Sequence, residues 1–283
     1  VASLRRVVEV SEEIMGPRQP ERANYEGVLS GALIDLGRPR EALARMRALA
    51  GRIDDVQSKG ARFVATLMLA RAEMMAGAPR EALERMAALR RTEPALFGSF
   101  YAPMVMLAAA LAGDAAAVRE AQVDARAYLD RAAPREPGYK QAIEYFAAAT
   151  RAAGLEVASV EPLVRAHAAF AGSQDPIDVV TAARLSLDLG RARLRVGELE
   201  AAERELRAAL AAFEGALPPH HLDRAEALSA LAELALTQGR AEEAAQRATA
   251  AAAIYGATAE PDYPPLIHAR ELLARATVPR GGE

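Results

Sequence analysis

The fold is decided by two matching stretches, LGRARLRVG at residues 189–197 and LAELALTQG at residues 231–239. Each begins with leucine, continues with a small residue and ends with glycine, and the second copy follows the first after 42 positions. A further apolar pattern follows each glycine, with Ala202, Leu206 and Ala209 in one copy and Ala244, Ala248 and Ala251 in the other. A fixed period with two short helices per unit predicts an α-helical repeat array.

A second repeated phrase lies nearer the start of the chain. PREALARM at residues 39–46 returns as PREALERM at residues 79–86, and each copy follows a glycine with one residue between. Glycine can adopt the left-handed conformation that ends a helix, and proline at the first helical position lacks an amide that would need a partner. The Gly-x-Pro sequence therefore predicts a sharp turn between antiparallel helices. Glycines that end a first-helix pattern, with or without the following proline, occur at 37, 77, 113, 154, 197 and 239, which predicts six helical hairpins.

These glycines and the prolines near them divide the whole chain, residues 1–283, into segments of a single solenoid. We expect residues 1–16 to be the second helix of a repeat whose first half is cut away, because apolar and charged residues fall on opposite sides of a helix there. The chain begins at Val1 and reads as a fragment of a longer protein, or alternatively as a processed mature chain. The expected segments that follow are repeats one and two at 21–94, irregular repeats three and four at 95–172, repeats five and six at 176–256, a capping helix at 264–277 and a disordered tail at 278–283. Pro103, Pro134 and Pro137 make the middle segment the expected place of any bend.

Composition limits the class of protein. Hydrophobic residues make up 52% of the 283 residues, but aromatic residues only 5%, so the core must be built largely from alanine and leucine in closely packed helices. A net charge of −3 lacks the basic excess of a nucleic-acid binder. The chain has no cysteine, no apolar run long enough to span a membrane and no signal-peptide pattern at Val1–Ile14. We expect a cytoplasmic protein that binds neither nucleic acid nor membrane.

These units resemble tetratricopeptide repeats, in the long form of about 42 residues found in kinesin light chains and bacterial regulators. The residues that carry the resemblance are Gly190, Gly197, Ala202, Leu206 and Ala209, with their counterparts in the other units. The phrase at 13–20 is also similar to regions that trail bacterial serine/threonine kinases. The resemblance implies an all-α, right-handed α-solenoid that binds a protein or peptide on its concave face. The middle units depart from the pattern at Val118 and Ser159, which leaves their register open.

The resemblance also indicates which side chains face the concave surface. In each first helix, one of them directly follows the small residue, and the others lie three or four residues beyond that position. The candidate partner-binding residues are Asp35, Arg71, Met75, Arg151, Arg184, Arg191, Arg195 and Glu233, and Gly31, Met74 and Leu194 belong to the same face. The Lys and Asn clamp that chaperone-binding members use for a terminal carboxylate is absent, so that partner is not expected.

Two interpretations of the arginines remain open. Arg184, Arg191 and Arg195 should form one basic stripe beside Arg151, which could hold an acidic or phosphorylated peptide through paired arginine contacts. Alternatively, the stripe is a solvated surface that Glu144, Asp188, Glu226 and Glu233 neutralise. The methionines at 68, 74, 75, 86, 104 and 106 could line an adaptable apolar groove, although their helical spacing is more typical of a core.

No catalytic, metal or cofactor site is expected. His220 and His221, with Asp223 and Glu226 close behind, invite a metal interpretation, but adjacent histidines at a helix start point in different directions. We interpret them as an exposed helix entry after two prolines. The glycines at 190 and 197 lie inside a helical pattern and lack the Gly-Lys-Ser/Thr of a phosphate loop, and no Gly-x-Ser-x-Gly elbow is present.

The sequence therefore favours a non-catalytic scaffold that binds protein or peptide, as the interaction or regulatory segment of a larger bacterial protein. One alternative is a sensor that binds a small effector in a pocket near the third and fourth repeats. Another is a homo-oligomer formed through the end units, in which Leu4, Val7, Val8 and the last helix would dock on a second copy.

Overall fold

The computed structural model describes residues 20–53, 58–94, 101–134, 136, 138–153 and 161–278, together with Arg6 and Val10. In these residues the chain forms thirteen α-helices, α2 to α14, and no β-strand. The helices belong to two compact units, Val1–Tyr128 and Leu129–Glu283, which are considered one at a time. The prediction of an all-α repeat fold is confirmed. The single continuous solenoid, its bend and the register of the middle repeats stay predictions.

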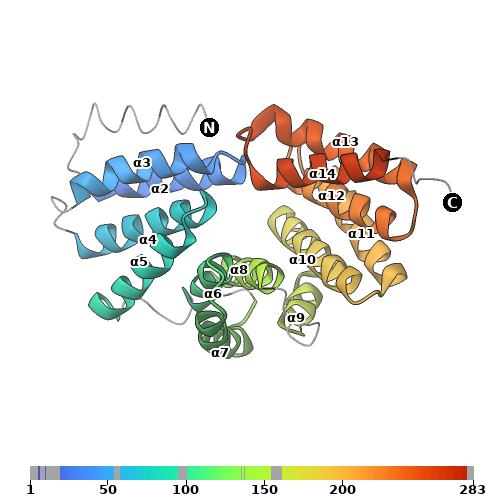
Figure 1. Cartoon of the computed structure of the whole chain (residues 1–283). Coiled ribbons are helices and arrows are strands. Elements are labelled where there is room, and N and C mark those ends of the chain that lie inside the picture. Colours follow the sequence, from blue (N-terminus) through green and yellow to red (C-terminus); the bar gives the residue numbers. More distant parts are fainter. Residues whose placement is uncertain are drawn as a thin grey trace. The chain divides into compact units, whose positions relative to one another are not determined.

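The described part of the first unit forms three pairs of helices (Figure 1). The last of these helices, α7, crosses the unit boundary. The helices are α2 (Pro20–Asp35), α3 (Pro39–Ile53), α4 (Lys59–Met75), α5 (Pro79–Thr92), α6 (Ala102–Leu111) and α7 (Ala115–Arg131). In the α2–α4 region the core forms where the small residues of α3 face the first helices. Ala42 and Met46 are fully buried there against Leu29 and Leu33 of α2.

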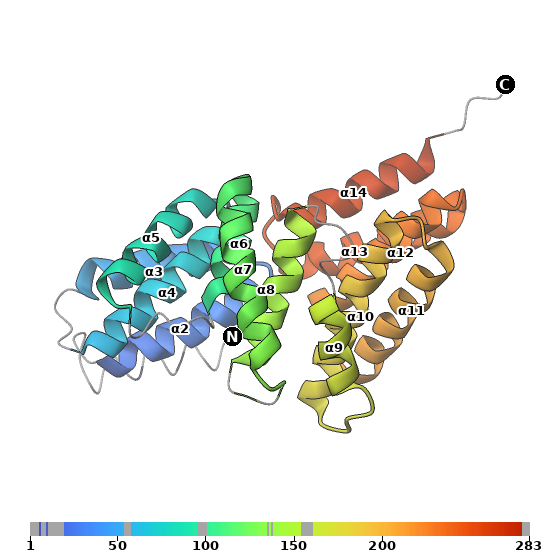
Figure 2. The same ribbon diagram turned by 90° about the horizontal axis from the view of Figure 1, so that it is seen from below.

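The second unit continues the alternation of first and second helices and ends in one extra helix (Figure 2). Its members are α8 (Tyr139–Ala152), α9 (Glu161–Phe170), α10 (Pro176–Arg195), α11 (Leu199–Ala216), α12 (Leu222–Thr237), α13 (Ala241–Thr258) and α14 (Pro264–Thr277). The core between α10, α11 and α12 contains Ala202, Leu206, Ala209 and Phe213, all fully buried. The predicted small, large and small positions of the second helix therefore pack as expected.

Every hairpin turn in the described residues uses the same backbone geometry. Five of the six predicted glycines are described, and all five have positive φ, between 69° and 89°. At Gly197 the glycine amide donates to the Leu194 carbonyl, and the next amide, of Glu198, donates to the Arg193 carbonyl. This Schellman pattern satisfies carbonyls that the ending helix leaves without partners. The prediction of turns at these glycines is thus confirmed at 37, 77, 113, 197 and 239.

The residue after each of these glycines serves both helices. The Arg38 amide closes the turn by donating to the Leu33 carbonyl, and the Arg38 carbonyl accepts from Ala42 in the first turn of α3. Ala78 does the same between α4 and α5, where Pro79 takes the first helical position without an unused amide. A single residue therefore ends one Schellman turn and begins the next helix.

The helices α10 and α11 pack closely at Gly190. A Cβ atom placed on Gly190 would lie 2.7 Å from Leu206 and 3.2 Å from the Cβ atom of Glu205. Leu206 is fully buried, so it has little freedom to move away. The small residue at this position is therefore required by contact between the two helices and not by a turn.

Some sequence predictions fall on residues that the structure does not describe. These are the helix expected at 1–16, the glycine at 154, Ser159 and the tail from 279 to 283. Residue 278 is described and follows the end of α14 directly. At 264–277, where a capping helix is expected, the structure has α14, which spans Pro264–Thr277, and its role as a cap stays a prediction.

Candidate functional site

A pocket of about 400 Å³ lies within the second unit, on the side formed by first helices. It receives one residue from α8 and further residues from α10, α12, α13 and α14. The lining residues are Arg151, Arg191, Leu194, Arg195, Glu226, Ser229, Ala230, Glu233, Tyr255, Pro264, Pro265 and His268. Of the eight candidate residues expected on the concave surface, Arg151, Arg191, Arg195 and Glu233 come together here.

Helical periodicity explains which side chains reach the pocket. On α12 the lining residues Glu226, Ser229 and Glu233 recur at spacings of three and four, which places them on one face. Ala227 and Leu231, from the opposite side of the same helix, are buried against α10 and α11. The polar face and the core face of α12 are therefore separated by the same periodicity that forms the repeat.

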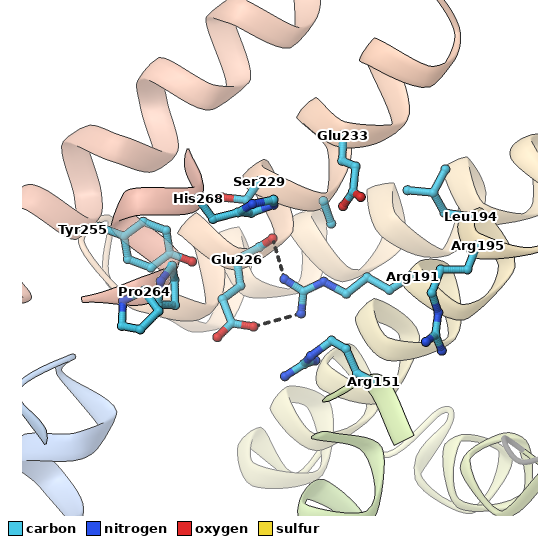
Figure 3. Close-up of a pocket in the computed structure, with 12 residues that line it drawn as sticks. Arg151, Arg191, Leu194, Arg195, Glu226, Ser229, Glu233, Tyr255, Pro264 and His268 are labelled. Carbon is cyan, nitrogen blue, oxygen red and sulfur yellow. Dashed lines mark hydrogen bonds and ion pairs between the residues drawn. The ribbon is translucent and has the colours of Figure 1, made fainter. Parts of the chain in front are cut away.

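An ion pair between α10 and α12 forms one wall of the pocket. Arg191 donates to the Glu226 carboxylate at 3.0 Å and to the Glu226 backbone carbonyl at 3.4 Å (Figure 3). Burial opposes ionisation of Glu226, but the charges of Arg191, Arg151 and Arg184 outweigh it and lower the pKa of this carboxyl group. The Arg191 side chain is therefore committed to holding the two first helices together.

The other predicted arginines of the stripe are also largely committed. Arg151 forms an ion pair with Asp188. Arg184 lies outside the pocket and binds Glu144 at 2.9 Å and Asp223 at 2.8 Å. Burial works against the Arg184 charge, yet the two carboxylates raise the pKa of its guanidinium above the ordinary value. Three of the four arginines are thus neutralised, as the solvated-surface interpretation expected, although partly through Asp223, which that interpretation did not name.

Two opposite charges in the pocket remain available. Arg195 is exposed and Glu233 is half-buried, and neither side chain forms an ion pair or a side-chain hydrogen bond within the described part of the chain. Figure 3 shows the guanidinium groups of Arg195 and Arg151 on one side of Arg191 and the Glu233 carboxylate on the other. The pocket is therefore charged on both sides with opposite sign.

Polar and apolar groups line the region near Glu226. The Ser229 hydroxyl is buried and has no hydrogen-bond partner at standard geometry, although it lies near enough to the Tyr255 hydroxyl to affect its ionisation. Burial, followed by the charge of Glu226, raises the pKa of Tyr255 well above its ordinary value. Tyr255 also packs edge to face against the Tyr263 ring, with 5.8 Å between ring centroids. This aromatic contact fixes α14 beside α13 and so positions His268 at the pocket.

The first unit places its candidate residues differently. Asp35 and Arg71 form an ion pair of 3.3 Å between α2 and α4, and both line a surface pocket of about 510 Å³ with Gly31. Met75 packs partly buried against the core cluster, and Met74 is buried within the unit. The described structure therefore assigns the methionines at 74 and 75 to packing, together with the buried residues Met86, Met104 and Met106.

The paired histidines have a local structural role. His221 is the N-cap of α12, and its Nδ1 atom accepts a hydrogen bond of 3.2 Å from the Asp223 amide. Within the described ranges, no three His, Cys, Asp or Glu side chains are arranged to share a metal ion. Among the described helices, none is both long and apolar enough to span a membrane.

Sequence reasoning missed Ser229, Tyr255, Pro264 and His268. The last two belong to α14, which we had interpreted only as a cap. The sequence does contain a signal for the ion pairs of the pocket wall. Charged partners on successive first helices lie about one repeat apart in the sequence, as Arg191 and Glu226 do. The same spacing would have placed Glu226 beside Arg191, but the approach of α14 depends on the connector after α13 and has no such pattern.

Comparison with known proteins gives a limited result. No known family matches the chain, and no curated protein matches it. Among solved structures, the chain is similar to a putative kinesin light chain of Podosopora anserina with nearly identical TPR-like repeats. The identity is 18%, the match covers 83% of this chain and 96% of that one, and the TM-score is 0.41.

A form of the same fungal protein with one residue substituted matches with 19% identity, over 83% of this chain and 95% of that one, also at a TM-score of 0.41. At such identities the likeness concerns the fold alone. The all-α repeat fold rests on the glycine turns and paired helices described above, and not on this likeness.

Proposed function

We propose that the chain is a non-catalytic scaffold that binds a segment of another protein at the pocket formed by α8, α10, α12 and α14. The observation that supports this most directly is the combination of committed and available charges. Arg191 and Glu226 hold the wall of the pocket in place, whereas Arg195 and Glu233 have no partner among the described residues. A pre-formed polar surface loses little conformational entropy on binding.

The acidic or phosphorylated partner expected from the sequence is supported mainly by Arg195. Contact with Arg151, Arg184 or Arg191 would compete with the carboxylates that they already bind. The assignment to the regulatory segment of a larger bacterial protein rests on the resemblance of the repeat phrases. The assignment to the cytoplasm rests on the lack of cysteine and of a long apolar run.

A photo-cross-linking residue at the pocket tests the scaffold proposal. His268 is 48% exposed and lines the pocket, whereas the exposed Arg270 lies on the same helix but outside the lining. We would place the same cross-linker at either position and irradiate the protein in an extract of its source cells. The proposal expects discrete protein adducts at 268 that are absent at 270. Equal adducts at both positions, or none, would remove this pocket as the partner-binding surface.

A second candidate function is the small-effector sensor, which a pocket of about 400 Å³ with several polar groups also suits. The pocket receives Arg151 from α8 of the fourth repeat, but the rest of its lining comes from α10, α12, α13 and α14, which follow the third and fourth repeats named in the sequence-based expectation. A metabolite screen by thermal shift separates the two functions. A hit whose stabilisation disappears in an Arg195→Gln variant would favour the sensor over the scaffold.

A further inference from the structure

The charges around the pocket are balanced in number. Three arginines line it, and the carboxylates of Glu226 and Glu233 line it with them, while Asp188 neutralises Arg151 from outside the lining. A ligand of a single charge sign would therefore meet a repelling group as well as an attracting one. A strongly acidic segment that reached Arg195 would approach Glu233 and Glu226, whereas a strongly basic one would approach the three arginines.

Glu233 should gain more from a ligand group of opposite charge than Arg195 does. This residue is half-buried at the pocket, and no cation pairs with its carboxylate in the described residues. A partly desolvated charge without a partner is unfavourable, and a basic group from a ligand would relieve that cost. Arg195, being exposed, loses less hydration and offers a bidentate contact to a carboxylate.

The two available charges lie on neighbouring first helices, Arg195 on α10 and Glu233 on α12. Packed helices have axes on the order of 8–10 Å apart, and an extended peptide advances roughly 3.3–3.6 Å per residue. One extended segment can therefore reach both charges with side chains about two or three positions apart. Beside Arg195 it would cover Leu194, which also lines the pocket.

We propose that the pocket selects a peptide segment that carries an acidic and a basic side chain about two or three residues apart, with the acidic group on Arg195 and the basic group on Glu233. This inference rests on the proposed scaffold function and specifies the chemistry of its partner. It replaces the purely acidic ligand expected from the sequence with a mixed-charge one.

The test uses a library of random hexapeptides displayed on phage and the full chain as bait. The bait is the unchanged protein, Arg195→Gln, Glu233→Gln or the control Arg204→Gln, in which the altered side chain is exposed on α11 outside the pocket. Both pocket substitutions keep the approximate size of the polar side chain and break no ion pair in the described structure. Far-UV circular dichroism and thermal unfolding confirm that the four proteins are equally folded.

The unchanged protein and Arg204→Gln should both enrich peptides with an acidic and a basic residue at one preferred spacing. In the Arg195→Gln selection, the enrichment of acidic residues should fall about tenfold while that of basic residues stays the same. In the Glu233→Gln selection, the enrichment of basic residues should fall instead. A change of about tenfold is what the loss of one charge-assisted contact would cause. Enriched peptides without a charge preference, or preferences unchanged by both substitutions, would overturn the inference and leave the scaffold proposal standing. Failure to enrich any peptide above a bait-free control would count against both.

Discussion

The hairpins α4–α5 and α10–α11 place an ion pair at the same two positions with opposite sign. Arg85 of α5 binds Glu73 of α4 through two hydrogen bonds of 2.9 and 2.6 Å. In the other hairpin, the position of Glu73 is taken by Arg193 and that of Arg85 by Glu205, and these two lie 3.7 Å apart. The glycine and the small positions coincide in the two hairpins, so the backbone accepts either direction of the charge.

The two pairs differ more in burial than in sign. The Glu73 side chain is 1% exposed and depends on the bidentate contact with Arg85. Arg193 and Glu205 are 31% and 22% exposed, so water can solvate both. Burial increases the cost of leaving one charge unpaired far more than it strengthens the ion pair. Removing one partner should therefore destabilise the protein strongly at Glu73 and Arg85, and only slightly at Arg193 and Glu205.

The largest effect should follow from removing one partner of the buried pair. Arg85→Ala leaves the Glu73 carboxylate buried without a cation, and we expect it to lower the free energy of unfolding by about 3–5 kcal/mol. Urea denaturation of the full chain, followed by circular dichroism, measures the change. The double variant Glu73→Leu, Arg85→Met should recover most of the loss. If the double variant is as unstable as Arg85→Ala, packing and not the unpaired charge explains the defect.

The same hairpins differ at the small position of the first helix, where α4 has Ala70 and α10 has Gly190. Gly190→Ala would force a methyl group against Leu206, at a cost of about 1–3 kcal/mol, and would gain about 1 kcal/mol of helix propensity. We expect a net loss of about 0–2 kcal/mol in urea denaturation. Gly256→Ala is the matched control, because open space surrounds a Cβ atom there and only the gain should appear. A more stable Gly190→Ala protein would mean that α10 and α11 can separate.

A third comparison concerns the position near the end of the second helix, which is Phe213 in α11 and Tyr255 in α13, both buried. Burial holds the pKa of Tyr255 above that of an unfolded tyrosine, which is about 10. Stability from the protonated phenol is complete below about pH 10 and falls by roughly 1 kcal/mol per pH unit above it, until the folded pKa is reached. Tyr255→Phe should flatten this alkaline decline between about pH 9 and 11 in thermal unfolding. An identical decline in both proteins would show that other groups cause it.

The smallest effect should come from the exposed pair. Arg193→Ala removes a contact of 3.7 Å between two partly solvated groups, and we expect about 0.5 kcal/mol or less. A double-mutant cycle with Glu205→Ala isolates the pair from the individual substitutions. A coupling energy as large as that of Glu73 and Arg85 would contradict the role assigned to burial.

The sequence was sufficient to predict the hairpins, because each turn depends on a local requirement. A glycine at positive φ and a proline at the first helical position are readable without knowledge of the rest of the chain, as at Gly77 and Pro79. The expectation that Arg151, Arg191, Arg195 and Glu233 share one face came from the family resemblance, and in the structure all four line one pocket.

Partner choice among the charges could not be read from the sequence. Arg45 binds Glu26 of its own hairpin, whereas Arg85 at the equivalent position binds Glu73, and Arg184 bridges two other first helices. Each choice depends on which carboxylate the packed helices bring within reach. The contribution of α14 to the pocket depends in the same way on tertiary packing, through the contact of Tyr255 with Tyr263.

At each of these hairpin turns, one residue is shared by two helices, so the turn cannot accommodate an additional residue. At Arg38, Ala78 and Glu198 an inserted residue would break either the Schellman bond or the first turn of the next helix. The glycine-to-glycine distance nevertheless differs from one repeat to the next, so the difference must be absorbed by helix length and by the connectors between hairpins. We therefore expect natural insertions, and engineered tags or domains, to be tolerated in the connectors between hairpins and not at the glycine turns.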